Sequence, residues 1–486
     1  MPDLARASVA GCLVLAGVAG GVACWQVAPD SSKDEYLESG LGGDVIVTIE
    51  GAVLVEAGGG DDSTNPGDDG GIEPGDGGGD GQEAAPVVVV TPTPSPSIGA
   101  GVSFGCDIDA TGAVWCWGND EYGQAGSSPS STSIAEPQLV AGITSATWVA
   151  LGDYHACAVT ASHVVYCWGL NGSYQLGHAA ATSGDLVCPG AVAGQTVPCT
   201  ATPTLVAGLP PAVAIAAAGT WTCIMAMDGS VQCWGGMQVS SDAGVPCGVG
   251  TQATGGTCYP APTVIAGVSG ATLLAVGTDH ACAVVAAGSS TDAGNQVACW
   301  GKNNEAQVSP TACPQSDCIT PALRSDLPTT TSLVAGNAFT CALAPSGSVS
   351  CFGDNSYGEL GHAAGSSGDQ GSTNLEAGLG VYNPTPMTAA ATSVASLVGG
   401  GNQAACTLLG TGTAECWGQV TSAGTPSPTS VAGLPLMKAL GSYDSSYVCG
   451  LAASDGSIWC WTLGSTTQPA QLVPPGGDAG DAAGPG

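Results

Sequence analysis

The chain has 486 residues, which is enough for several small domains or one large repeat domain. Only 5 Lys and Arg residues stand against 39 Asp and Glu residues, so the chain lacks the clustered cations that bind phosphate backbones or anionic membrane surfaces. We therefore expect no nucleic-acid partner. The 77 glycines and an aromatic content of 5% favour many short strands and tight turns over long surface helices.

Residues 1–23 predict an export signal. An apolar stretch rich in Gly and Ala occupies residues 7–23 and ends in a small-x-small cleavage pattern directly before Cys24. A single membrane anchor is the alternative, but the stretch is marginal for spanning a bilayer. Cys24 stands where a bacterial lipoprotein carries its lipid, although Gly21 replaces the usual Leu. Lipidation at Cys24 and simple secretion both stay open, and both predict an exported protein of the cell envelope or the extracellular space.

Residues 24–85 predict a disordered, acidic tether. Their stretch "AGGGDDSTNPGDDGGIEPGDGGGDG" has almost no large apolar side chain, so it cannot bury enough surface to offset its chain entropy. A calcium site is the alternative, but no D-x-D-x-D-G loop with a closing Glu is present. The tail, residues 474–486, has the same composition and the same prediction.

Residues 86–473 contain a sevenfold repeat. In each unit a Pro that opens a short apolar run precedes a cysteine by 20 residues, or by 21 in the last unit, and a second cysteine follows. The pairs are Cys106/Cys116, Cys157/Cys167, Cys223/Cys233, Cys282/Cys299, Cys341/Cys351, Cys406/Cys416 and Cys449/Cys460. Mainly the segment after the second cysteine changes length between the units.

Each unit predicts four β-strands. The run opened by Pro suits an edge strand, where the missing N–H does no harm. A following run of small apolar residues suits a place where strands converge, and the two cysteines flank a hairpin such as "TCIMAMDGSVQCWG". The seven units therefore predict an all-β fold, a seven-bladed β-propeller of four-stranded blades. A linear solenoid would need polar capping units, and none is visible. The run after Pro86 or the run after Pro469 completes the last blade.

The repeated cysteines predict disulfides. Opposed residues of a hairpin have Cα atoms about 4.5 to 5.5 Å apart, which a disulfide accepts. A zinc site would need C-x2-C knuckles or His ligands at metal spacing, and we find neither. Three further pairs lie in the variable segments, namely Cys188/Cys199, Cys247/Cys258 and Cys313/Cys318. We expect no metal, no cofactor and an oxidising compartment.

The unit "GDYHACAVTASHVVYCWGLNGSYQLGH", residues 152–178, resembles the repeat of the regulator of chromosome condensation family. Matching pieces include "GTDHACAV" at 277–284 and "GDNSYGELGH" at 353–362. The resemblance implies a seven-bladed propeller over residues 86–473. The nuclear founder of the family promotes guanine-nucleotide exchange and binds chromatin, but neither activity carries over to an acidic, exported chain. Secreted bacterial members imply binding of another protein through blade loops.

The five histidines do not form a recognisable site. His155 and His280 stand two residues before a blade cysteine, in a slot that other units fill with aromatic residues or Ala, so we expect packing positions. His178 and His362 follow a Leu-Gly turn, and His163 is isolated. No Asp or Glu stands at a fixed spacing to these histidines, so we expect no catalytic triad.

An aromatic residue follows the second cysteine in every unit, and we expect it to pack between blades. A carbohydrate-binding stripe is the alternative. The residues are Trp117, Trp168, Trp234, Trp300, Phe352, Trp417 and Trp461.

The variable segments carry the functional prediction. Segments 170–202, 235–261, 302–320 and 362–385 follow the same strand of blades 2 to 5, so in a ring they emerge on one side. Three of them hold their own cysteine pair, which reduces the ordering cost of binding. We expect these loops to bind a protein or a glycan. Tyr122, Tyr174, Tyr259 and Tyr357 are expected either as exposed anchors or as turn packing.

Two other functions stay open. An enzyme, either a hydrolase or a lyase, would need convergent carboxylates or histidines near the axis, and the repeat offers few. We therefore expect no enzymatic activity and no catalytic residue. A passive surface or structural role is the third possibility. In each case we expect a monomer.

Overall fold

The computed structural model describes residues 98–472 and four short strands closer to the N-terminus. Gaps in this description fall at residues 180–183, 191–193, 238–244, 247–256, 287–294, 312, 314–316, 367, 372–379, 392, 400–402, 421–423, 443–446 and 464–467. The chain divides into two units, residues 1–85 and residues 86–486. Among the residues that are described, none belongs to an apolar helix of membrane-spanning length.

The N-terminal unit holds two antiparallel strand pairs. Strand β1 (Val9–Leu15) pairs with β2 (Gly21–Gln26), and β3 (Val47–Ile49) pairs with β4 (Ala52–Leu54). The backbone register places Cys24 opposite Cys12. The export signal, the tether and lipidation of Cys24 stay predictions, and the tail at 474–486 lies outside the described residues.

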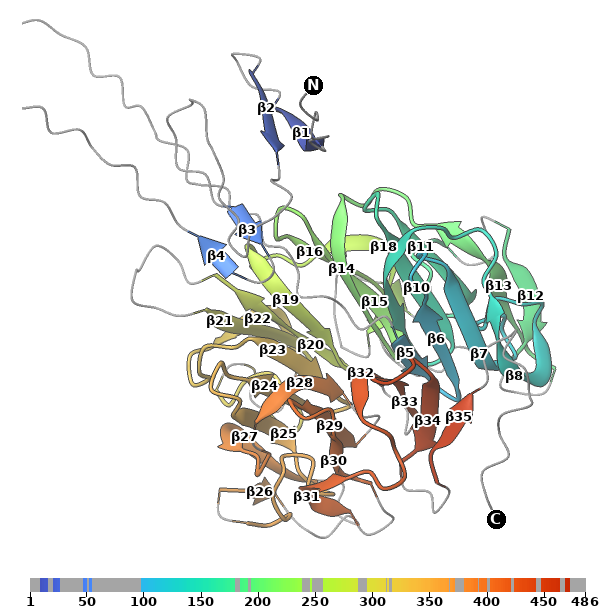
Figure 1. Ribbon diagram of the computed structural model, residues 1–486. Helices are drawn as coiled ribbons and strands as arrows, with labels where there is room; N and C mark the ends of the chain where they lie inside the picture. Colours follow the sequence, from blue (N-terminus) through green and yellow to red (C-terminus); the bar gives the residue numbers. More distant parts are fainter. Residues whose placement is uncertain are drawn as a thin grey trace, which may run out of the picture. The chain divides into compact units, whose positions relative to one another are not determined.

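The second unit is a seven-bladed propeller, as predicted, and Figure 1 shows its sheets following one another from β5 to β35. Blades 1 to 3 consist of β5 (Ile98–Gly101), β6 (Phe104–Ile108), β7 (Val114–Asp120) and β8 (Ser130–Leu139); β9 (Ala146–Leu151), β10 (His155–Thr160), β11 (Val165–Leu170), β12 (Leu186–Pro189) and β13 (Thr196–Leu205); and β14 (Ala212–Ala218), β15 (Thr220–Ala226), β16 (Val231–Met237), β17 (Val245–Pro246) and β18 (Thr257–Val264).

Blades 4 to 7 continue the series. They consist of β19 (Ala271–Val276), β20 (His280–Val285), β21 (Gln296–Gly301) and β22 (Cys318–Arg324); β23 (Ser332–Ala335), β24 (Phe339–Leu343), β25 (Val349–Asp354), β26 (Gln370–Gly371) and β27 (Val381–Thr388); β28 (Val394–Gly399), β29 (Ala404–Leu409), β30 (Ala414–Gly418) and β31 (Thr425–Ser430); and β32 (Met437–Ser442), β33 (Tyr447–Ala452), β34 (Ile458–Thr462) and β35 (Ala470–Leu472). In blades 2, 3 and 5 a short fifth strand (β12, β17 or β26) pairs outside the fourth.

The central hairpin of every blade carries a disulfide. The register sets the two cysteines directly opposite each other, as in Cys106 against Cys116 and Cys449 against Cys460. Their Cα atoms lie 4.1 Å apart in both blades, close enough for a bridge. The other bridged hairpins are Cys157–Cys167, Cys223–Cys233, Cys282–Cys299, Cys341–Cys351 and Cys406–Cys416. Disulfides of this number indicate an oxidising environment.

The glycine of Cys-Trp-Gly is needed for a bulge. At Gly118 the backbone has φ of +96°, and a Cβ there would stand 2.4 Å from the carbonyl oxygen of Ser103 in the turn before β6. The pairing of β7 with β8 shifts register at this point. Only a residue without a Cβ fits this conformation and this close approach together, which explains why six of the seven units place glycine here.

The hydrophobic core lies between neighbouring blades. Trp168 of blade 2 packs with Phe104, Val114 and other residues of blade 1, and Trp234 of blade 3 packs in the same way against blade 2. All seven aromatic residues of this slot are buried. The predicted packing between blades is therefore confirmed, and a carbohydrate-binding stripe is wrong because these rings are not accessible.

The last blade closes onto the first. Ile98, Ala100 and Trp117 of blade 1 share a buried cluster with Cys449 and Leu451 of blade 7. The outer strand of blade 7 is β35, from the run after Pro469. The competing run after Pro86 lies outside the described residues. Each of the seven described Pro-led runs forms the outer strand of one blade, and in blades 1 to 6 the run of small residues after it is the innermost strand of the next blade.

Candidate functional site

The variable segments emerge on one side of the ring. In blades 2 to 5 they join the third strand to the fourth, and corresponding strand ends point the same way in every blade. We call this side the connection face and define it by residues 171–195, 238–256, 302–317 and 355–380. The corresponding connections of blades 1, 6 and 7 are shorter, at residues 121–129, 419–424 and 463–469. Most of segment 238–256 lies outside the described residues.

A buried asparagine begins the connections of blades 2, 4 and 5. In blade 2, Asn171 Oδ1 accepts the backbone N–H of Leu176 over 3.2 Å, and Gln175 Oε1 accepts the N–H of Ser173 over 2.7 Å. Asn303 and Asn355 repeat the first bond in blades 4 and 5. These bonds satisfy backbone groups that a buried turn would otherwise leave unpaired, so the first turn of each connection is fixed in shape.

Two connections contain the same Asn–His–Asp network. In blade 5, His362 Nε2 lies 2.9 Å from Asp369 Oδ1, and Asn355 Nδ2 contacts both residues, at 3.0 Å from His362 Nε2 and 3.0 Å from Asp369 Oδ2. In blade 2, Asn171 Nδ2 donates to Asp185 Oδ2 over 3.0 Å, and His178 Nε2 lies 3.7 Å from Asp185 Oδ1.

The sequence interpretation of these histidines was wrong on one point. It found no acidic residue at a fixed spacing, whereas both networks have Asn, His and Asp at intervals of seven residues. This spacing can be read from the sequence, but it occurs in two of the connections and is not part of the repeat that all units share. The Asp369 carboxylate also accepts bonds from Asn383 Nδ2 and the N–H of Gly365, so it holds the loop together. No described nucleophile completes either network as a triad.

Disulfides pin two of the connections. Cys188 bridges to Cys199 between β12 and β13, and Cys313 bridges to Cys318 at the start of β22. Both bridges were predicted from the sequence. A pinned connection has less chain entropy to lose when a partner binds it.

Of the third predicted bridge, between Cys247 and Cys258, the structure describes one cysteine, Cys258. Cys258 is buried in β18, where the register places it opposite Gly236 of β16 and Val245 of β17. Cys258 is disulfide-bonded, as predicted, but Cys247 lies outside the described residues. The pairing of Cys258 with Cys247 therefore stays a prediction.

The connections also form part of the joints between blades. Backbone carbonyls of Gln124, Gln175 and Glu359 accept the indole N–H of the next blade's tryptophan. Trp168 donates to Gln124 over 2.9 Å, Trp234 donates to Gln175 over 2.9 Å, and Trp417 donates to Glu359 over 2.7 Å. The shape of a connection is therefore coupled to the contact between two blades.

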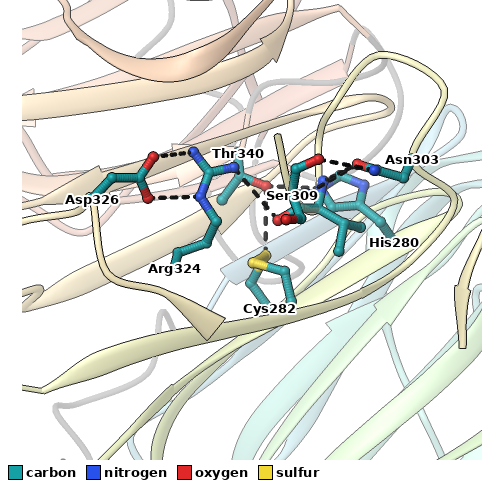
Figure 2. Close-up of a disulfide and its surroundings, with 9 residues drawn as sticks. His280, Cys282, Asn303, Ser309, Arg324, Asp326 and Thr340 are labelled. Atoms are coloured by element: carbon teal, nitrogen blue, oxygen red, sulfur yellow. Dashed lines mark hydrogen bonds and ion pairs between the residues drawn. A yellow bond between two sulfur atoms is a disulfide. The ribbon is translucent and has the colours of Figure 1, made fainter. Parts of the chain in front are cut away.

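The joint between blades 4 and 5 differs, because Phe352 replaces the tryptophan there. Arg324, buried at the end of β22, lies over the Phe352 ring with its guanidinium carbon 4.0 Å from the ring centroid. Its Nη2 donates to the carbonyl of Pro384 in blade 5 over 2.9 Å, and two further bonds of 2.8 Å join it to the Asp326 carboxylate (Figure 2). A buried cation between the blades thus takes the place of the indole.

Two histidines lie inside such joints. His280 Nε2 lies 2.8 Å from Thr340 Oγ1 of the next blade (Figure 2), and His155 Nε2 lies 2.8 Å from Thr222 Oγ1. Burial lowers the pKa of His155 to about 3 and that of His280 to about 4, so both rings are neutral at pH 7. Their geometry agrees with the predicted packing role.

Carboxylates gather on the connection face around blades 4 and 5. Lys302 Nζ lies 3.1 Å from Asp279 Oδ2. Burial raises the pKa of Asp279, and burial together with the negative charge of Asp354 raises the pKa of Glu305. Burial, and then the same Asp354 charge, raise the pKa of Glu359 to about 8. Burial and the neighbouring negative charge therefore favour the neutral forms of these carboxyl groups.

The four tyrosines differ in accessibility. Tyr122 is buried, packs with Leu170 and Cys199, and meets Tyr154 edge-on with ring centroids 5.3 Å apart. It is turn packing, and the idea that it is an exposed anchor is wrong because its ring faces the core. Tyr174, Tyr259 and Tyr357 are half-buried, and their binding role stays a prediction.

The axial channel offers no acid–base machinery among the described residues. Its cavity of about 670 Å³ is lined by the innermost strands, and the lining includes Trp148, Ile215, Leu273 and Leu397. The one charged residue of this lining is Lys438. Within the described ranges, no group of three or more His, Cys, Asp or Glu side chains could hold a metal ion.

One surface feature was missed by sequence reasoning. The outer strands of blades 1 to 4 each expose an apolar side chain two residues after the Pro, and all four are more than half exposed. These residues are Leu139, Leu205, Val264 and Leu323. Blades 5 to 7 hold Thr388, Ser430 and Gln471 there. We call the four side chains the outer apolar row. The sequence pattern that predicts this row is P-x-[LV], which was interpreted from the sequence only as part of an edge strand.

Comparison with known proteins agrees with this architecture. Models of the regulator of chromosome condensation (RCC1) repeat match residues 111–159 and 162–225, and also 148–175 and 331–359. The human E3 ubiquitin-protein ligase HERC2 is 36% identical over 87 residues, which are 18% of this chain and 2% of the ligase; the mouse ligase matches equally. The chain therefore spans a small part of these relatives.

Solved structures agree on the fold. Prp20p of Saccharomyces cerevisiae, whose binding to Gsp1p and histones has been described, superposes with a TM-score of 0.57 at 17% identity, over 75% of this chain and 87% of Prp20p. Human WBSCR16 gives 0.54 at 16% identity, over 72% and 84% of the two chains. At such identities the likeness shows the fold alone.

Proposed function

We propose that this chain, a seven-bladed propeller of the regulator of chromosome condensation repeat family, is an exported module that binds another protein through its connection face. Propellers of this type are generally protein-binding modules. One observation supports the proposal most: the long connections all belong to blades 2 to 5 and emerge on the same side, and disulfides pin those of blades 2 and 4.

The pinned connections meet the physical needs of a binding surface. The buried Asn turns, the Asn–His–Asp networks and the disulfides hold polar loops in shape before a partner arrives, which limits the entropy lost on binding. Partly exposed Tyr174 and Tyr357 lie in these turns, and tyrosine supplies contact area at a low entropic cost. We propose a protein partner because the core aromatic rings, which a glycan would stack on, are buried.

Site-specific photocrosslinking tests this proposal. A photoreactive phenylalanine analogue replaces Tyr174 on the connection face, Leu323 on the outer apolar row or Asp455 in a hairpin turn at the opposite ends of the strands. We expect one partner, competed away by unlabelled chain, to crosslink from position 174 and not from position 455. Crosslinking from position 323 alone would move the binding surface to the outer row, and equal crosslinking from all three positions would overturn the proposal.

Export has a test of its own. The disulfides and the apolar N-terminal stretch support secretion with cleavage before Cys24. Mass spectrometry of the protein from its native host should find a mature N-terminus at Cys24, with the mass of an attached lipid if the protein is anchored. An N-terminus at Met1 in a cytoplasmic fraction would contradict export.

A further inference from the structure

Glu359 occupies a position that is glutamine in three other turns. Gln124, Gln175 and Gln307 hold the equivalent place, and in all four turns the side-chain oxygen accepts the backbone N–H of the residue two positions earlier. Glu359 is completely buried. A carboxylic acid has nearly the shape of an amide, but only its neutral form has a hydrogen to donate where glutamine has its NH2 group.

Blade 1 shows what that donor group does. Gln124 Nε2 donates to Asn119 Oδ1 over 2.9 Å. Asn119 directly follows the glycine of Cys-Trp-Gly, and the residue at the same place in blade 5 is Asp354. The amide pair of blade 1 is therefore a pair of carboxyl groups in blade 5, separated by the same five residues.

The hydrogen bonds around the blade 5 pair leave one atom open. Glu359 Oε2 accepts the N–H of Tyr357 over 2.8 Å, and Asp354 Oδ1 accepts the N–H and O–H of Ser356. Within the described part of the chain, Glu359 Oε1 is buried and has no hydrogen-bond partner. A buried acceptor without a donor is costly, whereas a protonated Oε1 becomes a donor toward the Asp354 carboxylate.

The surroundings favour the neutral acid. Burial and then the charge of Asp354 raise the pKa of Glu359 to about 8, and burial also raises the pKa of Asp354. From blade 4, Glu305 adds negative charge, while Lys302 is paired with Asp279. From blade 6, the indole of Trp417 packs on this turn and carries no charge.

We propose that Asp354 and Glu359 share one proton, carried by Glu359 and donated to Asp354, and that this proton holds closed the joint between blades 5 and 6. The carbonyl of Glu359 is the acceptor for Trp417 Nε1, so the turn that the proton stabilises is also the contact with the next blade. When the proton leaves, the buried carboxylate of Glu359 and the half-buried carboxylate of Asp354 repel each other and the turn opens.

The sign of the pH dependence follows from the folded and unfolded states. An unfolded glutamate loses its proton near 4.5, whereas Glu359 in the folded chain keeps its proton up to about 8. The stabilisation is therefore complete below pH 4.5 and is lost as the pH rises through about 8. The joint between blades 5 and 6 should loosen in alkaline solution, unlike the joints that use glutamine.

Carbon-13 NMR of the full chain labelled at glutamate carboxyl carbons tests the proton directly. We expect one resonance to titrate near pH 8 and to be absent from the Glu359→Gln variant, which copies the other three turns. Asp354→Asn, which copies blade 1, should lower that titration midpoint because it removes the neighbouring negative charge. A Glu359 resonance that titrates together with the exposed glutamates would overturn the proposal.

Hydrogen exchange of the indole N–H groups tests the joint. Trp168 and Trp234 bind glutamine carbonyls and serve as internal controls for Trp417. Between about pH 4.5 and pH 8 the exchange of Trp417 should gain on that of the controls by up to roughly tenfold per pH unit and should then level off, and Glu359→Gln should abolish the gain. If all three indoles keep parallel exchange rates across this range, the shared proton does not control the joint.

Discussion

The joint between blades 4 and 5 and the joint between blades 5 and 6 connect neighbouring sheets by different chemistry. Between blades 5 and 6, the Trp417 indole donates one neutral hydrogen bond to a backbone carbonyl. Between blades 4 and 5, the indole is replaced by Phe352, and the buried Arg324 bonds the carbonyl of Pro384 and covers the ring. The slot accepts a different aromatic residue when a neighbouring side chain supplies the polar contact.

Removing the arginine should break the joint between blades 4 and 5. Arg324→Ala leaves the Pro384 carbonyl without this donor, opens a cavity and removes the cation over Phe352, and we expect it to lower the free energy of unfolding by about 4 kcal/mol. Denaturant unfolding monitored by fluorescence measures this change. The exposed Lys438→Ala is the control and should cost less than about 0.5 kcal/mol. Equal unfolding midpoints for the two variants would contradict the role given to Arg324.

Acid should weaken the joint between blades 4 and 5 through His280. Its folded pKa of about 4 lies below the ordinary value near 6.5, so its stabilisation is present above pH 6.5 and is lost as the pH falls toward 4. The loss amounts to about 3 kcal/mol at the acid end. His280→Phe, which copies Phe339 and Phe104 in the same slot, should flatten this dependence when unfolding is measured from pH 7 to pH 4. An unchanged slope would show that His280 is not the titrating group.

The disulfide of a blade hairpin and the disulfide of a connection should differ in their effect on stability. Replacing both Cys341 and Cys351 with Ala removes the disulfide from the central hairpin of blade 5, the blade shared by both joints. We expect this change to lower the free energy of unfolding by about 2 to 3 kcal/mol. Replacing Cys313 and Cys318 frees a connection and should leave the main unfolding transition within about 1 kcal/mol of wild type. Calorimetry of the two double variants measures both effects. A larger loss from the connection bridge would mean that the connections support the blades.

The tryptophan hydrogen bond should have the smallest effect. Trp417→Phe keeps an aromatic ring that the slot accepts at Phe352, but leaves the Glu359 carbonyl without its donor, and should cost about 1 kcal/mol. Trp300→Phe is the matched control because Trp300 Nε1 has no hydrogen-bond partner within the described residues. If both variants lose the same stability, ring volume and not the hydrogen bond decides the joint.

The repeat made the fold predictable, while the details of the site required the structure. The cysteine pair recurs seven times and the Trp-Gly sequence recurs in five of the seven units, so they predicted blade number, hairpins and the core between blades. Contacts that occur in one or two blades are not repeated along the sequence, so no recurring pattern predicts them. Examples are the contact of Arg324 with Phe352 and that of His362 with Asp369, which depend on the shape of the loops. Tyr122 was ambiguous because a turn tyrosine can point inward or outward, and only packing against Leu170 and Cys199 decides its direction.

Hydrogen–deuterium exchange of the chain with and without its crosslinked partner tests the central claim most directly, because it maps the binding surface without substitutions. The connection face predicts slower exchange in residues 171–190 and 302–313, and no change in the hairpin turns at residues 109–112, 226–230 and 344–348. Protection confined to those turns, or to the outer apolar row of blades 1 to 4, would contradict binding through the connection face.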